Sequence, residues 1–176
     1  MIKSSEVING RILRVMDGKD PEEFFRSNYY NIFKECLDIA DIEYYVTAVG
    51  ILGKALENEV KEYTNKTLKN KNMFSTNTPN LPIDKIRKIF AKESHFNRIK
   101  LLNLQEVTVS GKRFKLKKKF LKDEDYNELL AISKARNDAF HGCDEERYNE
   151  LDAKAQSYID RGVVILAMLE KINTKN

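Results

Sequence analysis

The stretch IEYYVTAVGILGKALENEVKEY, residues 42 to 63, decides the fold class. Its apolar residues recur every three or four positions, the period of one face of an α-helix. The stripe consists of Ile42, Val46, Val49, Leu52, Leu56, Val60 and Tyr63. The pattern predicts one long amphipathic helix, starting at about residue 41, that buries an apolar stripe against the rest of the molecule.

Helical signals recur on both sides of this stretch. Asp20 suits an N-cap, Pro21 the first helical position and Glu23 a capping box. The polar segment 64–82 interrupts the helical period and is predicted to be a connector. Besides the helix at 41–63, helices are predicted at about residues 20–37, 82–90, 123–142 and 145–172.

Residues 105–119 have a different period. Val107 and Val109 alternate with polar residues, Ser110-Gly111 offers a turn, and Phe114 and Leu116 alternate again. This pattern predicts a small β-hairpin inserted between helices. Because 176 residues match the usual size of one domain, we expect a single all-α domain over residues 1–176, a helical bundle with an inserted β-hairpin at about 105–119.

Composition excludes several classes of protein. No apolar run approaches the roughly 18 residues of a membrane span, and the first residues lack the apolar block of a signal peptide. We therefore expect a cytoplasmic protein without membrane contact. Cys36 and Cys143 are interpreted as ordinary small apolar residues, and His95, which has no ligand pair at metal spacing, as a surface or packing residue. The chain has no phosphate-loop motif, and we expect neither a metal nor a cofactor.

Positive charge is concentrated in GKRFKLKKKFLK, residues 111–122. Seven of the 31 basic residues lie in this segment, which contains no acidic residue. The rest of the chain has 24 basic and 27 acidic residues. A local basic strip fits a polyanion such as RNA. The predicted RNA-binding residues are Lys112, Arg113, Lys115, Lys117, Lys118 and Lys119. The alternative is a solvated, lysine-rich loop with no ligand.

The stretch LLAISKARNDAFHGC, residues 129–143, carries the candidate chemistry. At about 100° per residue, Arg136 lies at about −20° from Leu129, in the middle of the apolar stripe. A guanidinium on an apolar face is costly unless it is paired or binds an anion. Asn137 and His141 are i, i+4 neighbours on the flank of the same face. Gly142 is the expected end of the helix.

These three residue types suit the cleavage of RNA. A histidine can transfer a proton near neutral pH, and an arginine can stabilise a pentavalent phosphorane. The nucleophile would be the ribose 2′-hydroxyl, so this chemistry requires no metal. The predicted catalytic residues are Arg136, Asn137 and His141.

The sequence RNDAFHG, residues 136–142, resembles the signature of the HEPN superfamily (higher eukaryotes and prokaryotes nucleotide-binding domains). That signature has an arginine, a polar residue directly after it, and a histidine after four to six intervening residues. The resemblance implies a helical bundle and a metal-independent endoribonuclease, commonly a toxin or defence effector. It also implies a homodimer with a composite site, and in some members an antitoxin or a nucleotidyltransferase partner, for which Tyr148 is a candidate target.

A second interpretation remains open at this point. An Arg and a His five positions apart occur by chance in many helices, so the alternative is a noncatalytic helical interaction or RNA-binding module. In that case Arg136 would form a structural ion pair.

Overall fold

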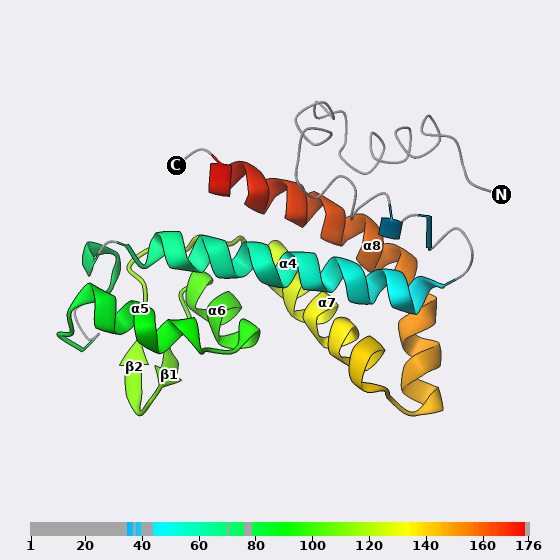
Figure 1. The fold of residues 1–176 in the computed structure, drawn as a ribbon, viewed down its shortest axis with the longest axis horizontal. Coiled ribbons are helices and arrows are strands. Elements are labelled where there is room, and N and C mark those ends of the chain that lie inside the picture. The colour runs from blue at the N-terminus through cyan, green and yellow to red at the C-terminus, as the bar shows by residue number, and fades with distance from the viewer. Residues whose placement is uncertain (1–34, 37, 40–43, 70, 76–78, 175–176) are drawn as a thin grey trace.

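The computed structural model describes residues 35–36, 38–39, 44–69, 71–75 and 79–174. Apart from its last few residues, the predicted helix at 20–37 lies outside the described residues, so that prediction and the extent of the domain before residue 35 stay predictions. Elsewhere the chain is mostly helical, with one two-stranded hairpin (Figure 1). The predicted all-α fold class is therefore confirmed.

Three long helices form the body of the molecule: α4 (Tyr45–Thr67), α7 (Asp123–His141) and α8 (Glu145–Thr174). All three pack against one another (Figure 1). The predicted stripe of α4 is buried at Val49, Leu52, Leu56 and Val60. Burial of this stripe explains why the stretch folds as a helix, since packing of an amphipathic face supplies most of the stability of helices in proteins. The helix continues one turn beyond the predicted end at Tyr63.

Two glycines allow the long helices to approach closely. A Cβ atom at Gly53 of α4 would lie 2.5 Å from the Cβ of Arg136 on α7. A Cβ atom at Gly162 of α8 would lie 2.7 Å from Cδ2 of Leu52. Both distances are shorter than carbon atoms tolerate, so a larger residue at Gly53 would meet the stem of Arg136, and one at Gly162 would displace the end of Leu52.

The segment between α4 and the hairpin contains more regular structure than the sequence predicted. A 3₁₀ turn, η1 (Lys71–Met73), interrupts the predicted connector, and helix α5 (Ile83–Ala91) follows with Pro82 as its N-cap, close to the predicted 82–90. A further helix, α6 (His95–Leu102), was not predicted. Ser94 caps it by accepting a hydrogen bond from the backbone N–H of Asn97.

The predicted hairpin is present and is shorter than its predicted range. Strand β1 (Val107–Val109) pairs antiparallel with β2 (Lys112–Phe114), and Val107 faces Phe114 across the pair. Gly111 occupies the turn with a φ of +72°, a left-handed conformation that favours glycine. Phe114 and Leu116 are buried in the common core, which anchors this segment to the bundle.

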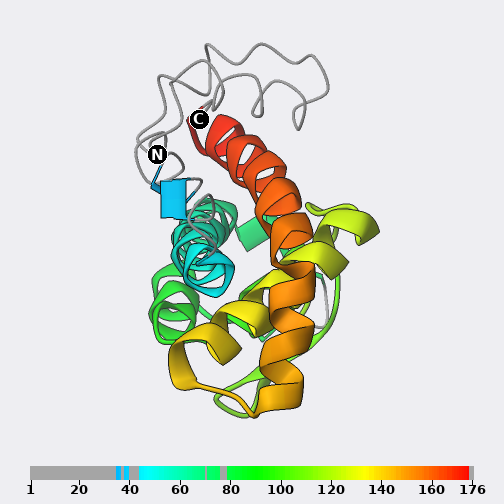
Figure 2. The same cartoon turned by 90° about the vertical axis from the view of Figure 1, so that its right-hand side faces the viewer.

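The turn from α7 into α8 is fixed by capping and by charge. Gly142, with a φ of +80°, ends α7 as predicted. Asp144 accepts a hydrogen bond from the backbone N–H of Arg147 in the first turn of α8, and the Arg147 guanidinium pairs with Asp138 on α7 at 2.8 Å. Figure 2 views the end of the molecule that carries this turn. In the described part of the chain, no helix combines the length and the apolar character that a membrane span requires.

Candidate functional site

Arg136 lies on the face of α7 that packs against α4, as its position in the apolar stripe predicted. The stem of its side chain lies over Gly53, where the absence of a Cβ makes room for it. Its side chain is 22% exposed. The guanidinium donates from Nη2 to Glu57 Oε2 at 2.8 Å and from Nη1 to Asn137 Oδ1 at 2.7 Å. The anion that compensates the arginine is therefore a carboxylate of the same chain.

One carboxylate oxygen of Glu57 accepts hydrogen bonds from two positively charged side chains, Arg136 and Lys54. Oε2 also accepts a hydrogen bond from Lys54 Nζ at 2.8 Å. Burial by itself raises the pKa of Glu57, and the Lys54 hydrogen bond together with the charge of Arg136 outweighs that effect, so the pKa lies below its ordinary value. The carboxylate is therefore ionised at neutral pH and keeps the guanidinium in one place.

His141 occupies the last turn of α7, one turn beyond Asn137, and its side chain is exposed. Phe140 beside it is 57% exposed, and one edge of its ring rests on Gly50 of α4. The Arg136 guanidinium carbon lies 5.5 Å from the centre of the Phe140 ring, within cation–π range. The motif thus presents a half-buried arginine, an aromatic ring and an exposed imidazole along one helix end.

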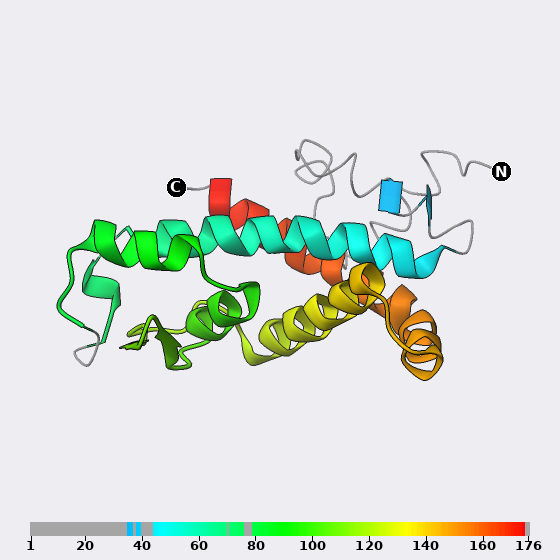
Figure 3. The same cartoon turned by 60° about the horizontal axis from the view of Figure 1, so that its bottom comes forward.

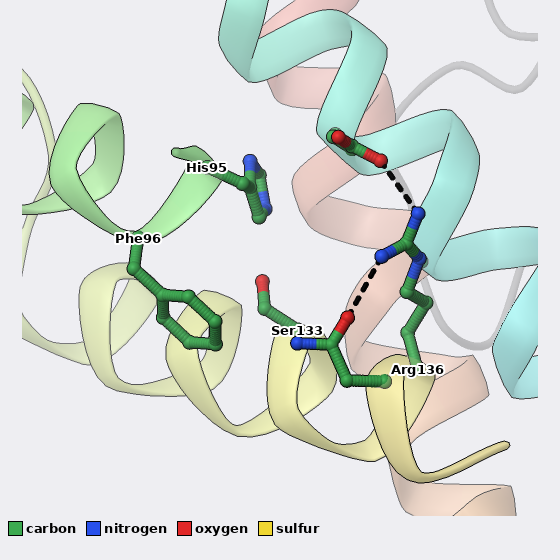
Figure 4. Close-up of a pocket in the computed structure, with 7 residues that line it drawn as sticks. His95, Phe96, Ser133 and Arg136 are labelled. Atoms are coloured by element: carbon green, nitrogen blue, oxygen red, sulfur yellow. Dashed lines mark hydrogen bonds and ion pairs between the residues drawn. The ribbon is translucent and has the colours of Figure 1, made fainter. Parts of the chain in front are cut away.

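A small pocket opens where α4, α6 and α7 meet (Figure 4). Its volume is about 20 Å³. Arg136 and Asn137 line it, and His141 does not. The remaining lining residues come from three helices: Gly53, Glu57, His95, Phe96 and Ser133. The structure therefore separates the predicted triad into two residues at the pocket and one at the exposed helix end.

His95 was predicted to be a surface or packing residue, and its ring is indeed largely shielded from solvent. The structure adds that this ring lines the pocket (Figure 4). Burial lowers the pKa of His95 to about 4; the Glu57 carboxylate opposes this shift, and Arg136, Arg98 and Lys54 add to it. The ring is therefore neutral at physiological pH.

Several pocket residues could not be found from sequence spacing. Glu57 lies 79 positions before Arg136, and His95 lies on the unpredicted helix α6. A usable signal existed for α6, because Ser94 directly precedes HFNRIKLL and serine is a favoured N-cap. Glu57 is one of many acidic residues on the helices and had no distinguishing signal.

The basic strip forms the outer side of the hairpin region. Phe114 and Leu116 point inward, while Arg113, Lys115, Lys117, Lys118 and Lys119 are exposed and Lys112 is partly exposed. Arg113 lies 3.7 Å from Glu106, and Lys119 pairs with Asp123 at 2.5 Å. Lys118 lies 5.0 Å from the centre of the Phe120 ring. Some of these charges are thus compensated locally.

The basic strip and the motif lie at different ends of the molecule. The hairpin is at one end of the long dimension, and the turn between α7 and α8 is at the other (Figures 1 and 3). The structure therefore does not bring the strip and the motif together. A ligand that contacts both must extend along the bundle.

Comparisons with protein-family models, with curated proteins and with solved structures found no match to this chain. Within the described ranges, no group of three or more His, Cys, Asp or Glu side chains is placed to hold a metal ion.

Proposed function

We propose that this protein is a metal-independent endoribonuclease of the HEPN type, acting as a toxin or defence effector. The observation that carries the proposal is the Arg136 guanidinium, held between Glu57 and Asn137 on the helix that ends with the exposed His141. An immobilised cation and an accessible imidazole five residues further along the same helix are the kinds of group that 2′-hydroxyl attack on a phosphodiester requires.

In the proposed reaction, each motif residue has a separate task. The 2′-oxygen of the substrate attacks the adjacent phosphorus, and the bond from phosphorus to the 5′-oxygen breaks, which leaves a cyclic phosphate. His141 accepts the proton of the attacking 2′-hydroxyl or donates a proton to the leaving 5′-oxygen, and solvent water exchanges the other proton. Arg136 stabilises the negative charge of the phosphorane. Asn137 holds the guanidinium through its Oδ1 atom.

The ion pair with Glu57 is compatible with this role for Arg136. A guanidinium has five N–H groups, and the hydrogen bonds to Glu57 and Asn137 use one on each terminal nitrogen. The second N–H of each terminal nitrogen remains for an anionic oxygen. Because the carboxylate fixes the guanidinium beforehand, little reorganisation is needed when charge develops on the phosphorane.

A second copy of the chain would complete the site in this proposal. Among the described residues, the exposed large hydrophobic side chains are Tyr44, Phe140 and Tyr148. They lie at the start of α4, the end of α7 and the start of α8, and these three ends meet at one end of the molecule (Figures 1 and 3). Exposed apolar surface of this kind is typical of protein interfaces. A homodimer would cover it and bring two motifs together.

Two further elements of the proposal concern other partners. The exposed Tyr148, 49% accessible, is the candidate target for a nucleotidyltransferase partner. An antitoxin would have to cover the same end of the molecule to block access to His141.

The catalytic assignment is tested with Arg136→Ala and His141→Ala. Each is expected to reduce the cleavage of single-stranded RNA, measured in EDTA, by at least about a hundredfold, because each removes a group that acts in the transition state. The matched control is Lys134→Ala, which removes an exposed positive charge from the same helix and should leave the rate unchanged. Cleavage that survives either motif substitution contradicts the proposal.

The RNA-binding assignment is tested separately on the strip. Replacing Lys117, Lys118 and Lys119 with Gln should weaken RNA binding and reduce its salt dependence by roughly 0.7 per lost phosphate contact. The control is the same triple change made at Lys85, Lys88 and Lys92 of the α5 region. An unchanged slope for the hairpin variant would mean that the strip is a solvated surface.

One observation favours a noncatalytic interaction module as a second candidate. The Arg136–Glu57 ion pair joins α7 to α4 and gives Arg136 a structural role. Removing one partner of a fully buried pair costs about 3 to 5 kcal/mol. The two side chains are 22% and 30% exposed, so the catalytic proposal expects a smaller loss for Arg136→Ala. If Arg136→Ala loses the full amount of about 3 to 5 kcal/mol of stability and the wild type does not cleave RNA, the interaction module is the better assignment.

A further inference from the structure

The starting point is a pair of buried polar atoms that the catalytic proposal does not use. Both ring nitrogens of His95 are shielded from solvent and have no hydrogen-bond partner among the described residues. An unsatisfied buried polar atom costs about 1 to 3 kcal/mol. Buried polar groups in folded proteins nearly always have a partner, which is often an ordered water molecule.

The space beside the ring has the size of such a partner. The pocket next to His95 has a volume of about 20 Å³, which is sufficient for one water molecule. It is far too small for a nucleotide, and the shielded nitrogens are inaccessible to an RNA chain. The imidazole of His95 and the hydroxyl of Ser133 point toward this same space (Figure 4).

The hydrogen-bonding groups around the pocket complement a water molecule. The neutral His95 ring has one donor and one acceptor nitrogen. Ser133 donates its hydroxyl hydrogen to the Leu129 carbonyl, so its oxygen is left as an acceptor. Asn137, whose Oδ1 accepts a hydrogen bond from the Arg136 guanidinium, also lines the pocket and carries a side-chain amide with two N–H donors. A water molecule, with two donors and two acceptors, can bond with groups of both kinds.

We propose that this pocket binds one structural water molecule, and that through it His95 is a positioning residue for Arg136. The water connects α6 to the catalytic face of α7, beside Asn137, which holds the guanidinium of Arg136 (Figure 4). The water site stands on geometry alone, while the positioning role rests on the proposed ribonuclease activity.

The water site is tested by a crystal structure at a resolution that reveals ordered solvent. One water within hydrogen-bonding distance of a His95 ring nitrogen is the expected result, and a dry pocket would overturn the proposal. His95→Phe keeps the shape of the ring without its nitrogens and should lose this water. This test has no activity readout, so it is valid even if the protein does not cleave RNA.

The positioning role is tested by kinetics on the same variant. His95→Phe is expected to lower kcat by about tenfold or more and to leave KM unchanged, since a small displacement of a catalytic group has a large effect on rate. His95→Asn places an amide near the position of Nδ1, and His95→Gln places one near the position of Nε2. The variant whose amide forms a hydrogen bond with the water should recover part of the kcat lost in His95→Phe. An unaltered kcat in His95→Phe, or a rise in KM alone, contradicts the positioning role of His95. The ribonuclease assignment is tested separately, by the substitutions of Arg136 and His141.

Discussion

Positive charge is handled differently at the pocket between the helices and at the hairpin. At the pocket, Arg136 is partly buried and is held by Glu57 and Asn137. At the hairpin, Arg113 is 75% exposed and lies 3.7 Å from Glu106. Coulomb interactions are weak and easily screened in water and stronger where solvent is partly excluded. An arginine can therefore order a site between helices and, on an exposed hairpin, contribute only to a diffuse positive potential.

The comparison extends to the packing beneath the charges. Around the pocket, three helices meet over Gly53, and a carbon atom added there has no space. At the hairpin, a carbon atom added at Gly111 meets nothing within 4 Å. We conclude that the packing beneath the pocket leaves no space for an added carbon at Gly53, whereas the hairpin turn leaves space at Gly111.

The largest expected effect is the pH dependence of stability that His95 introduces. The pKa of His95 is about 4 in the folded protein, and its ordinary value, which applies to the unfolded chain, is 6.5. Between pH 4 and pH 6.5 the unfolded chain therefore binds a proton at His95 and the folded protein does not. Stability is therefore complete above about pH 6.5 and falls as the pH decreases toward 4, by about 3 kcal/mol in all. The charged groups around the ring are Glu57 and Lys54 on α4, Arg98 on α6 and Arg136 on α7.

The measurement is the free energy of unfolding from pH 4 to 7 for the wild type and His95→Phe. The variant should lack this component, so the difference between the two curves isolates it from the carboxylates. The chain has two histidines, which makes His141→Asn the matched control, expected to retain the dependence on pH. Parallel curves for wild type and His95→Phe would show that the ring is not buried in neutral form.

A smaller effect is expected from adding one methyl group at the pocket and one at the hairpin turn. Gly53→Ala forces a carbon against the Cβ of Arg136, and we expect a loss of about 2 kcal/mol despite the better helix propensity of alanine. In Gly111→Ala the added carbon contacts no atom, and the cost of about 1 kcal/mol comes only from placing alanine at a left-handed φ. Denaturant titration compares the two. Equal losses of stability would remove the distinction between a crowded pocket and an open hairpin turn.

The smallest expected effect compares the two ion pairs. Glu57→Gln should destabilise the protein by about 1 to 2 kcal/mol, because its pair with Arg136 is partly buried. Glu106→Gln, at the exposed pair with Arg113, should leave the melting temperature unchanged. Thermal unfolding at low and high salt checks both. A larger loss for Glu106→Gln would reverse the comparison.

The elements predicted well are those that one local pattern defines. The stripe of α4, the glycine that ends α7 and the alternation around Ser110-Gly111 each lie within a short window. The predicted connector was wrong in part, because α4 extends to Thr67, and Phe74 is buried against the hairpin where it bridges Leu116. Burial by a distant segment leaves no local signal.

The candidate site divides in the same way. Arg136 was predicted to face inward because helical periodicity determines on which side of α7 it lies. Its partner Glu57 and the neighbouring His95 were not predicted, since both come from helices far away in sequence. A His with no ligand pair nearby is usually a packing residue, and only its surroundings in the fold distinguish this one.

The sequence by itself determined the helical class, the hairpin, the location of positive charge and the inward direction of Arg136, because these follow from residue spacing and composition. Only the tertiary structure decided that Glu57 compensates this arginine, that the buried His95 is neutral, and that strip and motif lie apart. Those properties depend on distances between helices and on the exclusion of solvent, which arise when α4, α6 and α7 pack together.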